Sequence, residues 1–170
     1  MRPWLSVGLC PPVALCALLA CGPASAECAG PPYDQLDFWL GAWHDPAAPP
    51  AEHYTARRTA GGCAIEEILT GADGQTQGVG LAGWDGERNQ WRQLWVDKDR
   101  IVTTYLGGPA RDGTFVLTSE PKAGGVRWRY TYRNIRPDGI DADYATTAGE
   151  DGRWKTIWSG HFDRIAPAQK

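Results

Sequence analysis

Glu67 is the acidic residue whose position in the sequence points most directly to chemistry. Residues 63, 65, 67 and 69 are Cys, Ile, Glu and Leu, and alternate residues of a β-strand share one face. This otherwise apolar face predicts that Glu67 points into the interior, where a carboxylate is costly unless it is paired or hydrogen-bonded. The polar residues that could partner it there are Gln93, Tyr105, Tyr144 and Arg164.

A buried Glu67 could play one of three roles. It could belong to a polar network that only fixes the register of the strands. Together with Gln93, it could orient the polar group of a mostly apolar ligand. With a pKa raised by burial, it could act as a general base in an enzyme. The sequence leaves all three roles open.

The common signatures of catalytic and metal sites are missing from the sequence. Ser119 and Ser159 lie outside any Gly-x-Ser-x-Gly motif, and His-Glu-x-x-His, Cys-x-x-Cys and a phosphate-binding glycine loop do not occur. His161 could in principle bind haem, but its parity is opposite to that of Trp158 and Phe162, which predicts a solvent-facing side chain. We therefore expect no metal and no cofactor.

Regularly spaced turn signals indicate which elements carry these residues. Asp-Gly and Gly-Gly pairs adopt positive φ at low cost in two-residue hairpin turns. Each segment between them is long enough for one strand, which must pair with its sequence neighbours, and this predicts an antiparallel meander. The turn signals fall at Gly61-Gly62, Asp73-Gly74, Asp85-Gly86, Asp97-Lys98-Asp99, Asp112-Gly113, Gly124-Gly125, Asp138-Gly139 and Asp151-Gly152.

The number of strands predicts a closed barrel. Adding strands near 42–45 and 53–59 to the meander gives about ten strands. An open meander of this length has two unpaired edges, and closure removes them. We predict an all-β fold, a single up-and-down antiparallel β-barrel of about ten strands, with a short N-terminal helix at 33–40 that plugs one end. The alternative, a two-sheet sandwich, usually needs longer crossover connections.

Tryptophan is abundant, with nine in 170 residues, and the alternation turns most of these rings inward, including Trp154. A barrel of this size is wide enough to leave a cavity, and an aromatic cavity with a few polar groups is the usual form of a small-molecule site. The alternative is that the rings simply fill the barrel. The residues expected to contact a ligand are Glu67, Trp91, Gln93, Trp95, Tyr105, Trp128, Tyr130, Tyr144 and Trp158.

The first 26 residues have the pattern of an export signal. Arg2 precedes the largely apolar residues 5–20, and Pro-Ala-Ser-Ala at 23–26 is a small-residue cleavage pattern, so that residues 27–170 form the mature domain. The stretch LLACG at 18–22 also resembles a bacterial lipobox, in which Cys21 would be lipidated. We expect a secreted or periplasmic protein, with a lipoprotein anchored through Cys21 as the alternative.

The mature domain retains two cysteines, Cys28 and Cys63. In an oxidising compartment, two cysteines indicate one disulfide, which would tie the N-terminus to the start of a strand. A structural zinc site would need more ligands, and a catalytic thiol would need an activating neighbour.

The charge balance limits the kinds of partner. The chain has 17 Lys and Arg against 20 Asp and Glu, a net charge of −3 at pH 7. This balance disfavours nucleic acid and anionic membranes. We expect one domain, a monomer, whose partner is a small hydrophobic or amphipathic molecule.

Three stretches occur together in a characteristic order, LDFWLGAW at 36–43, GCAIEE at 62–67 and WRQLWVD at 91–97. With Cys28, they resemble a family of secreted bacterial lipocalin-like proteins known mainly as a domain of unknown function, over nearly all of the mature chain. The resemblance implies a calycin-type barrel with a Cys28–Cys63 disulfide, an internal cavity and no assigned reaction. It also implies that Trp43, of the Gly41-x-Trp43 motif, lies at the closed end with Arg164 packed across it. The proline-rich residues 44–50 depart from the glycine-containing loop of the family.

We therefore predict a non-catalytic barrel that binds a small, partly hydrophobic ligand in its lumen. One alternative is a periplasmic barrel enzyme, an isomerase or hydrolase, that uses Glu67 as general base. The other is an interaction module with a filled barrel. A deep Glu67 that is neutralised by an arginine or a tyrosine would be compatible with the binding protein, whereas the enzyme needs a solvent-reachable pocket with Glu67 near the mouth.

Overall fold

The computed structural model describes residues 28–147 and 153–166. The predicted signal peptide at 1–26, with Cys21, lies outside the described residues. Within them, no helix is long and apolar enough to cross a membrane. The elements, in chain order, are η1 (Asp37–Trp39), β1 (Gly41–His44), β2 (His53–Thr59), η2 (Ala60–Gly62), β3 (Ala64–Thr70), β4 (Thr76–Asp85), β5 (Gln90–Asp97), β6 (Val102–Pro109), β7 (Phe115–Ser119), η3 (Ala123–Gly125), β8 (Arg127–Arg133), β9 (Gly139–Thr147) and β10 (Lys155–Ala166).

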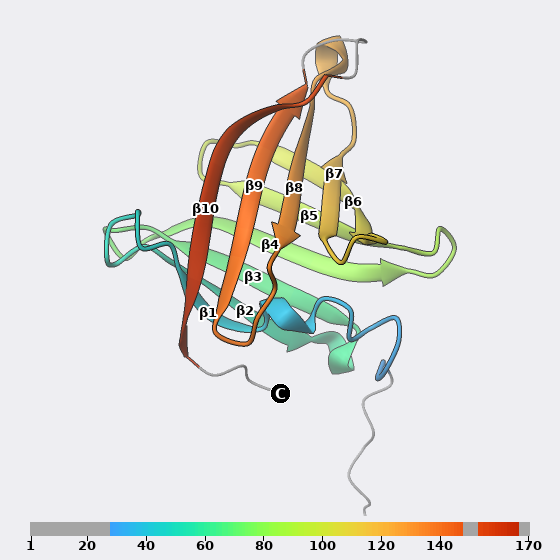
Figure 1. The fold of residues 1–170 in the computed structure, drawn as a ribbon, viewed down its shortest axis with the longest axis horizontal. Coiled ribbons are helices and arrows are strands. Elements are labelled where there is room, and N and C mark those ends of the chain that lie inside the picture. The colour runs from blue at the N-terminus through green and yellow to red at the C-terminus, as the bar shows by residue number, and fades with distance from the viewer. Residues whose placement is uncertain (1–27, 148–152, 167–170) are drawn as a thin grey trace, which may run out of the picture.

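The ten strands form a closed, up-and-down antiparallel barrel, which confirms the predicted fold (Figure 1). Each strand pairs with its neighbours in sequence, and β10 pairs with β1 to close the sheet. Predicted Asp-Gly turns supply tight connections within the described residues; Gly74, for example, has a φ of 73° between β3 and β4, a conformation that glycine adopts at low cost. The turn predicted at Asp151-Gly152 lies outside the described residues. Closure leaves no unpaired edge strand.

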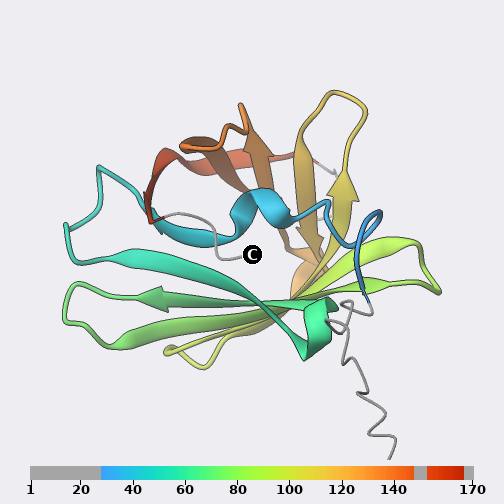
Figure 2. The same cartoon turned by 90° about the horizontal axis from the view of Figure 1, so that it is seen from below.

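One end of the barrel is closed by the segment that precedes β1. Seen from below, η1 lies across the barrel opening (Figure 2). The helix predicted at 33–40 is wrong, because this segment forms turns and the single 3₁₀ turn η1. So short a segment, between Pro31-Pro32 and the extended Gly41, cannot offset the cost of starting an α-helix.

Trp43 and Arg164 form the base of this closed end. The Trp43 side chain is fully buried, and its indole nitrogen donates a hydrogen bond of 2.7 Å to the carbonyl of Trp39. The guanidinium carbon of Arg164 lies 3.9 Å from the centre of the Trp43 ring. Arg164 also donates hydrogen bonds to the carbonyls of Leu40 and Phe38. It therefore ties the last strand to the segment around η1.

The disulfide between Cys28 and Cys63 is present, with the two Cα atoms 4.9 Å apart. It joins the start of the described chain to the turn between β2 and β3. A disulfide is typical of proteins from oxidising compartments outside the cytoplasm.

The alternation predicted for the last strand is interrupted. The pairing of β10 with β9 shifts between Thr156 and Trp158, so that Ile157 is an extra residue and is 51% exposed. A bulge of this kind reverses the faces of the residues before it. Trp154 therefore lies over the guanidinium group of Arg129, 4.3 Å from it, rather than on the inward face predicted from the alternation.

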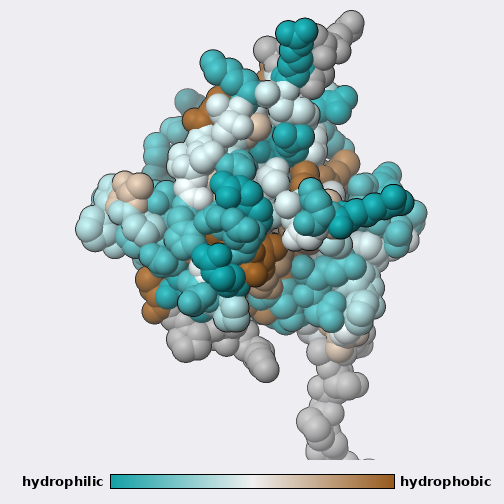
Figure 3. Space-filling model, in the orientation of Figure 1, coloured by the Kyte–Doolittle hydropathy of each residue, from teal (hydrophilic) through white to brown (hydrophobic). Residues whose placement is uncertain are grey.

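The outside of the barrel is mostly polar on the face shown in Figure 3. An exception occurs on β4 and β5, where Val79 lies opposite Val96 and Leu81 opposite Leu94 in the register. Each of these four side chains is more than 40% exposed.

Candidate ligand-binding site

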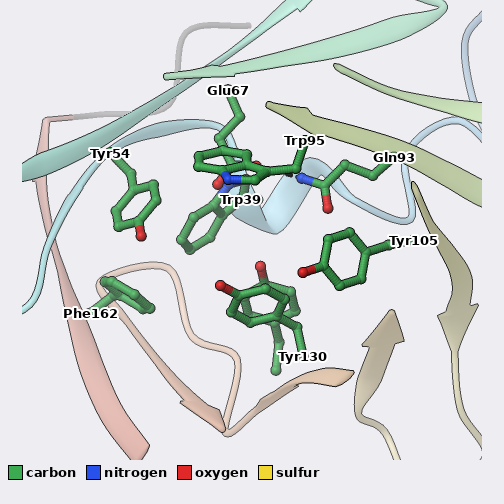
Figure 4. Close-up of a pocket in the computed structure, with 9 residues that line it drawn as sticks. Trp39, Tyr54, Glu67, Gln93, Trp95, Tyr105, Tyr130 and Phe162 are labelled. Carbon is green, nitrogen blue, oxygen red and sulfur yellow. Dashed lines mark hydrogen bonds between the residues drawn. The ribbon is translucent and has the colours of Figure 1, made fainter. Parts of the chain in front are cut away.

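A small cavity of about 30 Å³ lies inside the barrel above η1, with room for about two water molecules. Its walls are mainly aromatic, and its polar groups are one carboxyl, one amide and several phenol hydroxyls (Figure 4). The lining residues are Trp39, Tyr54, Glu67, Gln93, Trp95, Tyr105, Tyr130, Tyr132 and Phe162.

Glu67 and Gln93 form a hydrogen-bonded pair in the wall of this inner cavity. The two residues lie on β3 and β5, with β4 between them, and the Gln93 amide nitrogen donates to Glu67 Oε2 over 2.6 Å. Both side chains are buried, Glu67 with 6% exposure. Gly80 on β4 leaves space for them, because a Cβ at this position would lie 3.2 Å from each of the two bonded atoms.

Burial raises the pKa of Glu67 from 4.5 to about 7. Desolvation in the aromatic cavity is the main cause, and the nearby indole N–H of Trp39 and the amide of Gln93 oppose it. Although the Trp39 N–H lies close to the carboxyl group, its geometry completes no hydrogen bond with any described residue. Glu67 therefore changes charge near neutral pH.

Phenol hydroxyls surround the same space. The hydroxyls of Tyr54, Tyr105 and Tyr130 point toward the middle of the inner cavity (Figure 4). Burial raises the pKa of each of these tyrosines, so they stay neutral at physiological pH. The Tyr105 and Tyr144 hydroxyls are 3.4 Å apart.

Two larger pockets lie between the inner cavity and the open end of the barrel. One, of about 240 Å³, includes Tyr54, Trp158, Asp45 and Glu52 in its lining. The other, of about 200 Å³, includes Trp95, Trp128, Asp97 and Ile101. Both are lined by Tyr130 and Tyr144, and Tyr130 also lines the inner cavity, so the three spaces adjoin one another in the interior of the barrel, called the lumen below.

Glycines let two tryptophan rings lie flat against the wall of this lumen. A Cβ on Gly78 would come within 2.2 Å of Cζ2 of Trp95, and one on Gly160 within 2.2 Å of Cζ2 of Trp158. One face of each ring thus packs on backbone that carries no side chain. The rings line the outer pockets without filling them.

The structure brings eight of the nine predicted ligand-contacting residues together around the lumen. The exception is Trp91, which lines none of the three spaces. It is 1% exposed and donates a hydrogen bond of 3.2 Å to Gln35 near the closed end. Arg164, considered as a partner for Glu67, instead packs on Trp43 below the cavity.

Several lining residues were missed by the sequence reasoning. Trp39 lies in an irregular segment, where no periodicity indicates a direction. Tyr132 shares the inward face of its strand with Trp128 and Tyr130, but the sequence does not indicate that it reaches the cavity. The remaining missed residues are Tyr54, Phe162, Asp45, Glu52, Asp97, Ile101 and Thr103. The alternation of the last strand already turns Phe162 inward, and the alternation of β2 could have indicated Tyr54.

His161 lies on the outer side of the barrel, as expected. Its Nδ1 atom is 2.6 Å from Asp141 and its Nε2 atom is 3.3 Å from Asp163. Across the described ranges, no group of three or more histidine, cysteine or acidic residues is arranged to hold a metal ion.

No family model and no curated protein matches this sequence. The site is therefore interpreted from its own geometry.

Proposed function

We propose that this protein is an exported, lipocalin-like barrel that binds a small, partly hydrophobic molecule in its lumen. The observation that carries the proposal is the group of three adjoining spaces in the lumen, where the buried Glu67–Gln93 pair lines the inner cavity and aromatic rings line the two larger outer pockets. Ligand sites commonly combine a mostly apolar wall with a few convergent polar groups.

Membership of the secreted lipocalin-like family is part of this proposal. It is supported by the closed ten-stranded barrel, by Arg164 packed over Trp43, and by the Cys28–Cys63 disulfide. Export is supported by the same disulfide and by the leader-like sequence of residues 1–26.

The position of Glu67 distinguishes binding from catalysis. A general base must reach the proton that it removes, and Glu67 lies in the narrow inner cavity, hydrogen-bonded to Gln93, rather than at the mouth. This placement favours a polar anchor over a catalytic base. The outer pockets, which hold about 240 and 200 Å³, favour a container over an interaction module with a filled barrel.

The test uses N-phenyl-1-naphthylamine, a neutral and apolar fluorescent dye. We expect saturable enhancement of dye fluorescence with matching quenching of tryptophan emission, because Trp95, Trp128 and Trp158 line the outer pockets. Trp95→Ala should weaken the binding. Trp84→Ala is the matched control, because Trp84 lines none of the three spaces. Absence of saturable binding by this dye and by a broad panel of apolar compounds would refute the proposal.

A further inference from the structure

The lumen carries negative charge without a matching positive charge. Glu67 lies at its base, Asp45 and Glu52 line one outer pocket, and Asp97 lines the other. Among the described residues, no lysine, arginine or histidine lines any of the three spaces, and none of these four carboxyl groups forms an ion pair. An anionic ligand would therefore enter against repulsion.

The aromatic walls add a second, independent preference for positive charge. Rings attract cations over their faces, and the attraction grows when the cation is removed from water. Trp95 and Trp158 each pack one face on glycine backbone and line the lumen. Tyr105 and Tyr130 lie beside the inner cavity with ring centres 5.7 Å apart. A cation on its way to Glu67 would thus pass the free faces of Trp95 and Trp158 and then meet the tyrosine hydroxyl oxygens, which can accept hydrogen bonds from it (Figure 4).

The hydrogen-bond donors of the cavity do not reverse this preference. One N–H of the Gln93 amide is already used by Glu67 Oε2, and the Trp39 N–H lies close to the same carboxyl group and stabilises its charged form. The tyrosine hydroxyls can accept hydrogen bonds as well as donate them. The donors therefore support a carboxylate, which in turn suits an ammonium group.

We propose that the ligand is an amine with a small, protonated ammonium head and an apolar body. The ammonium group lies against Glu67 among the rings of the inner cavity. The body occupies the outer pockets, since the inner cavity of about 30 Å³ admits only a small head. Asp45, Glu52 and Asp97 attract the cation at the entrance. This inference rests on the proposed function of the lumen.

Three probes of nearly equal shape test the charge preference directly. They are 2-phenylethylamine, 2-phenylethanol and 3-phenylpropanoate, which end in a cationic, a neutral and an anionic group. We expect calorimetry at about pH 8 to show the amine binding about tenfold more tightly than the alcohol, and the carboxylate binding most weakly.

Glu67→Gln should remove the advantage of the amine over the alcohol. The control is Glu66→Gln, because Glu66 is the neighbouring residue and pairs with Arg57 on the opposite face of the strand. This control should keep the preference of the unmodified protein. The comparison of the three probes on the unmodified protein stands even where the Glu67 variant fails to fold.

The pH dependence gives a further readout. The titratable groups that face Glu67 are Tyr54 on β2, Tyr105 on β6, and Tyr130 and Tyr132 on β8, and burial keeps all four neutral. An alkylammonium stays protonated between about pH 6 and pH 8. With the pKa of Glu67 at about 7, affinity for the amine should rise about tenfold over this range, and this rise should vanish in Glu67→Gln.

The outcomes separate this inference from the proposed function. If the alcohol or the carboxylate binds as tightly as the amine, the inference is overturned and the lumen remains a ligand site. The same conclusion follows if N-phenyl-1-naphthylamine binds and none of the three probes does. If neither the dye and the apolar panel nor the probes bind, both proposals fail.

Discussion

Replacing Glu67 with glutamine tests the burial of its carboxyl group through the free energy of unfolding. Burial raises the pKa of Glu67 from 4.5 to about 7, so the folded state favours the protonated form. The stabilisation from this preference is fully present below about pH 4.5 and is lost as the pH rises through about 7. The difference between the two pKa values corresponds to about 3 kcal/mol.

Urea denaturation of the unmodified protein and of Glu67→Gln, at several values between about pH 4.5 and pH 8, measures this effect. Other titrating groups contribute equally to both proteins, so they cancel in the difference between the two free energies of unfolding. Relative to the variant, the unmodified protein should lose about 3 kcal/mol over this range. The glutamine side chain of the variant does not titrate, so the free energy of unfolding of the variant should lack the pH dependence that comes from residue 67.

Glu66→Gln provides the comparison on the outer face. Its side chain is partly exposed and pairs with Arg57 over 2.5 Å, and such pairs contribute little. The difference in the free energy of unfolding between Glu66→Gln and the unmodified protein should therefore change by less than about 1 kcal/mol over the same pH range. If the difference in the free energy of unfolding for Glu67→Gln is equally independent of pH, the Glu67 carboxyl is hydrated in the folded protein, and the description of the inner cavity is wrong.

Three further substitutions test the frame that holds the lumen. Replacing both cysteines of the disulfide, which are 35 residues apart, with serine should lower the free energy of unfolding by about 4 kcal/mol in urea denaturation, and an unchanged value would contradict the bond. Arg164→Ala should lower the free energy of unfolding by about 2–4 kcal/mol, because it removes the contact with the Trp43 ring and leaves carbonyl groups unpaired. Arg164→Lys should restore only part of this loss. Gly78→Ala should displace Trp95, lower the free energy of unfolding by about 1–3 kcal/mol and shift the tryptophan emission. Gly86→Ala, where the added methyl group meets open space, should leave both the free energy of unfolding and the emission unchanged.

The barrel was predictable because its two determinants are local in sequence. Side chains alternate with a period of two residues along each strand, and tight turns force neighbouring strands to pair. The alternation over residues 126–133 is enough to put Trp128, Tyr130 and Tyr132 on one face, and all three pack in or against the core. Closure followed from the cost of unpaired edges.

Depth along the barrel was not predictable from the same signal. Trp91 and Trp95 are four residues apart and share an inward face, yet Trp91 lies in the core toward the closed end and Trp95 lines the lumen. Alternation gives the face of a residue but not its height, which depends on strand tilt and on the position of η1. For this reason, Trp91 was included among the ligand contacts and Trp39 was missed.

Irregularities were also hidden from the pattern. The bulge at Ile157 reverses the faces before it, and the sequence signals it only by an apolar residue, Ile157, on a face that is otherwise polar. Trp154 was placed inward for that reason and instead packs on Arg129. The error is confined to the residues before the bulge, because Trp158 and Phe162 follow it and face the interior as predicted.

The glycines of the barrel wall explain why so many aromatic rings leave space for a ligand. A barrel of this size is readily filled by large side chains, and a ring that projects into the lumen would occupy its centre. Gly78 and Gly80 on β4 and Gly160 on β10 instead let Trp95 and Trp158 lie flat. The dimensions of the outer pockets thus depend on the packing of Trp95 and Trp158 against glycines, which have no side chain. Size selectivity in this lumen should accordingly change through substitutions of these glycines as much as through substitutions of the tryptophans.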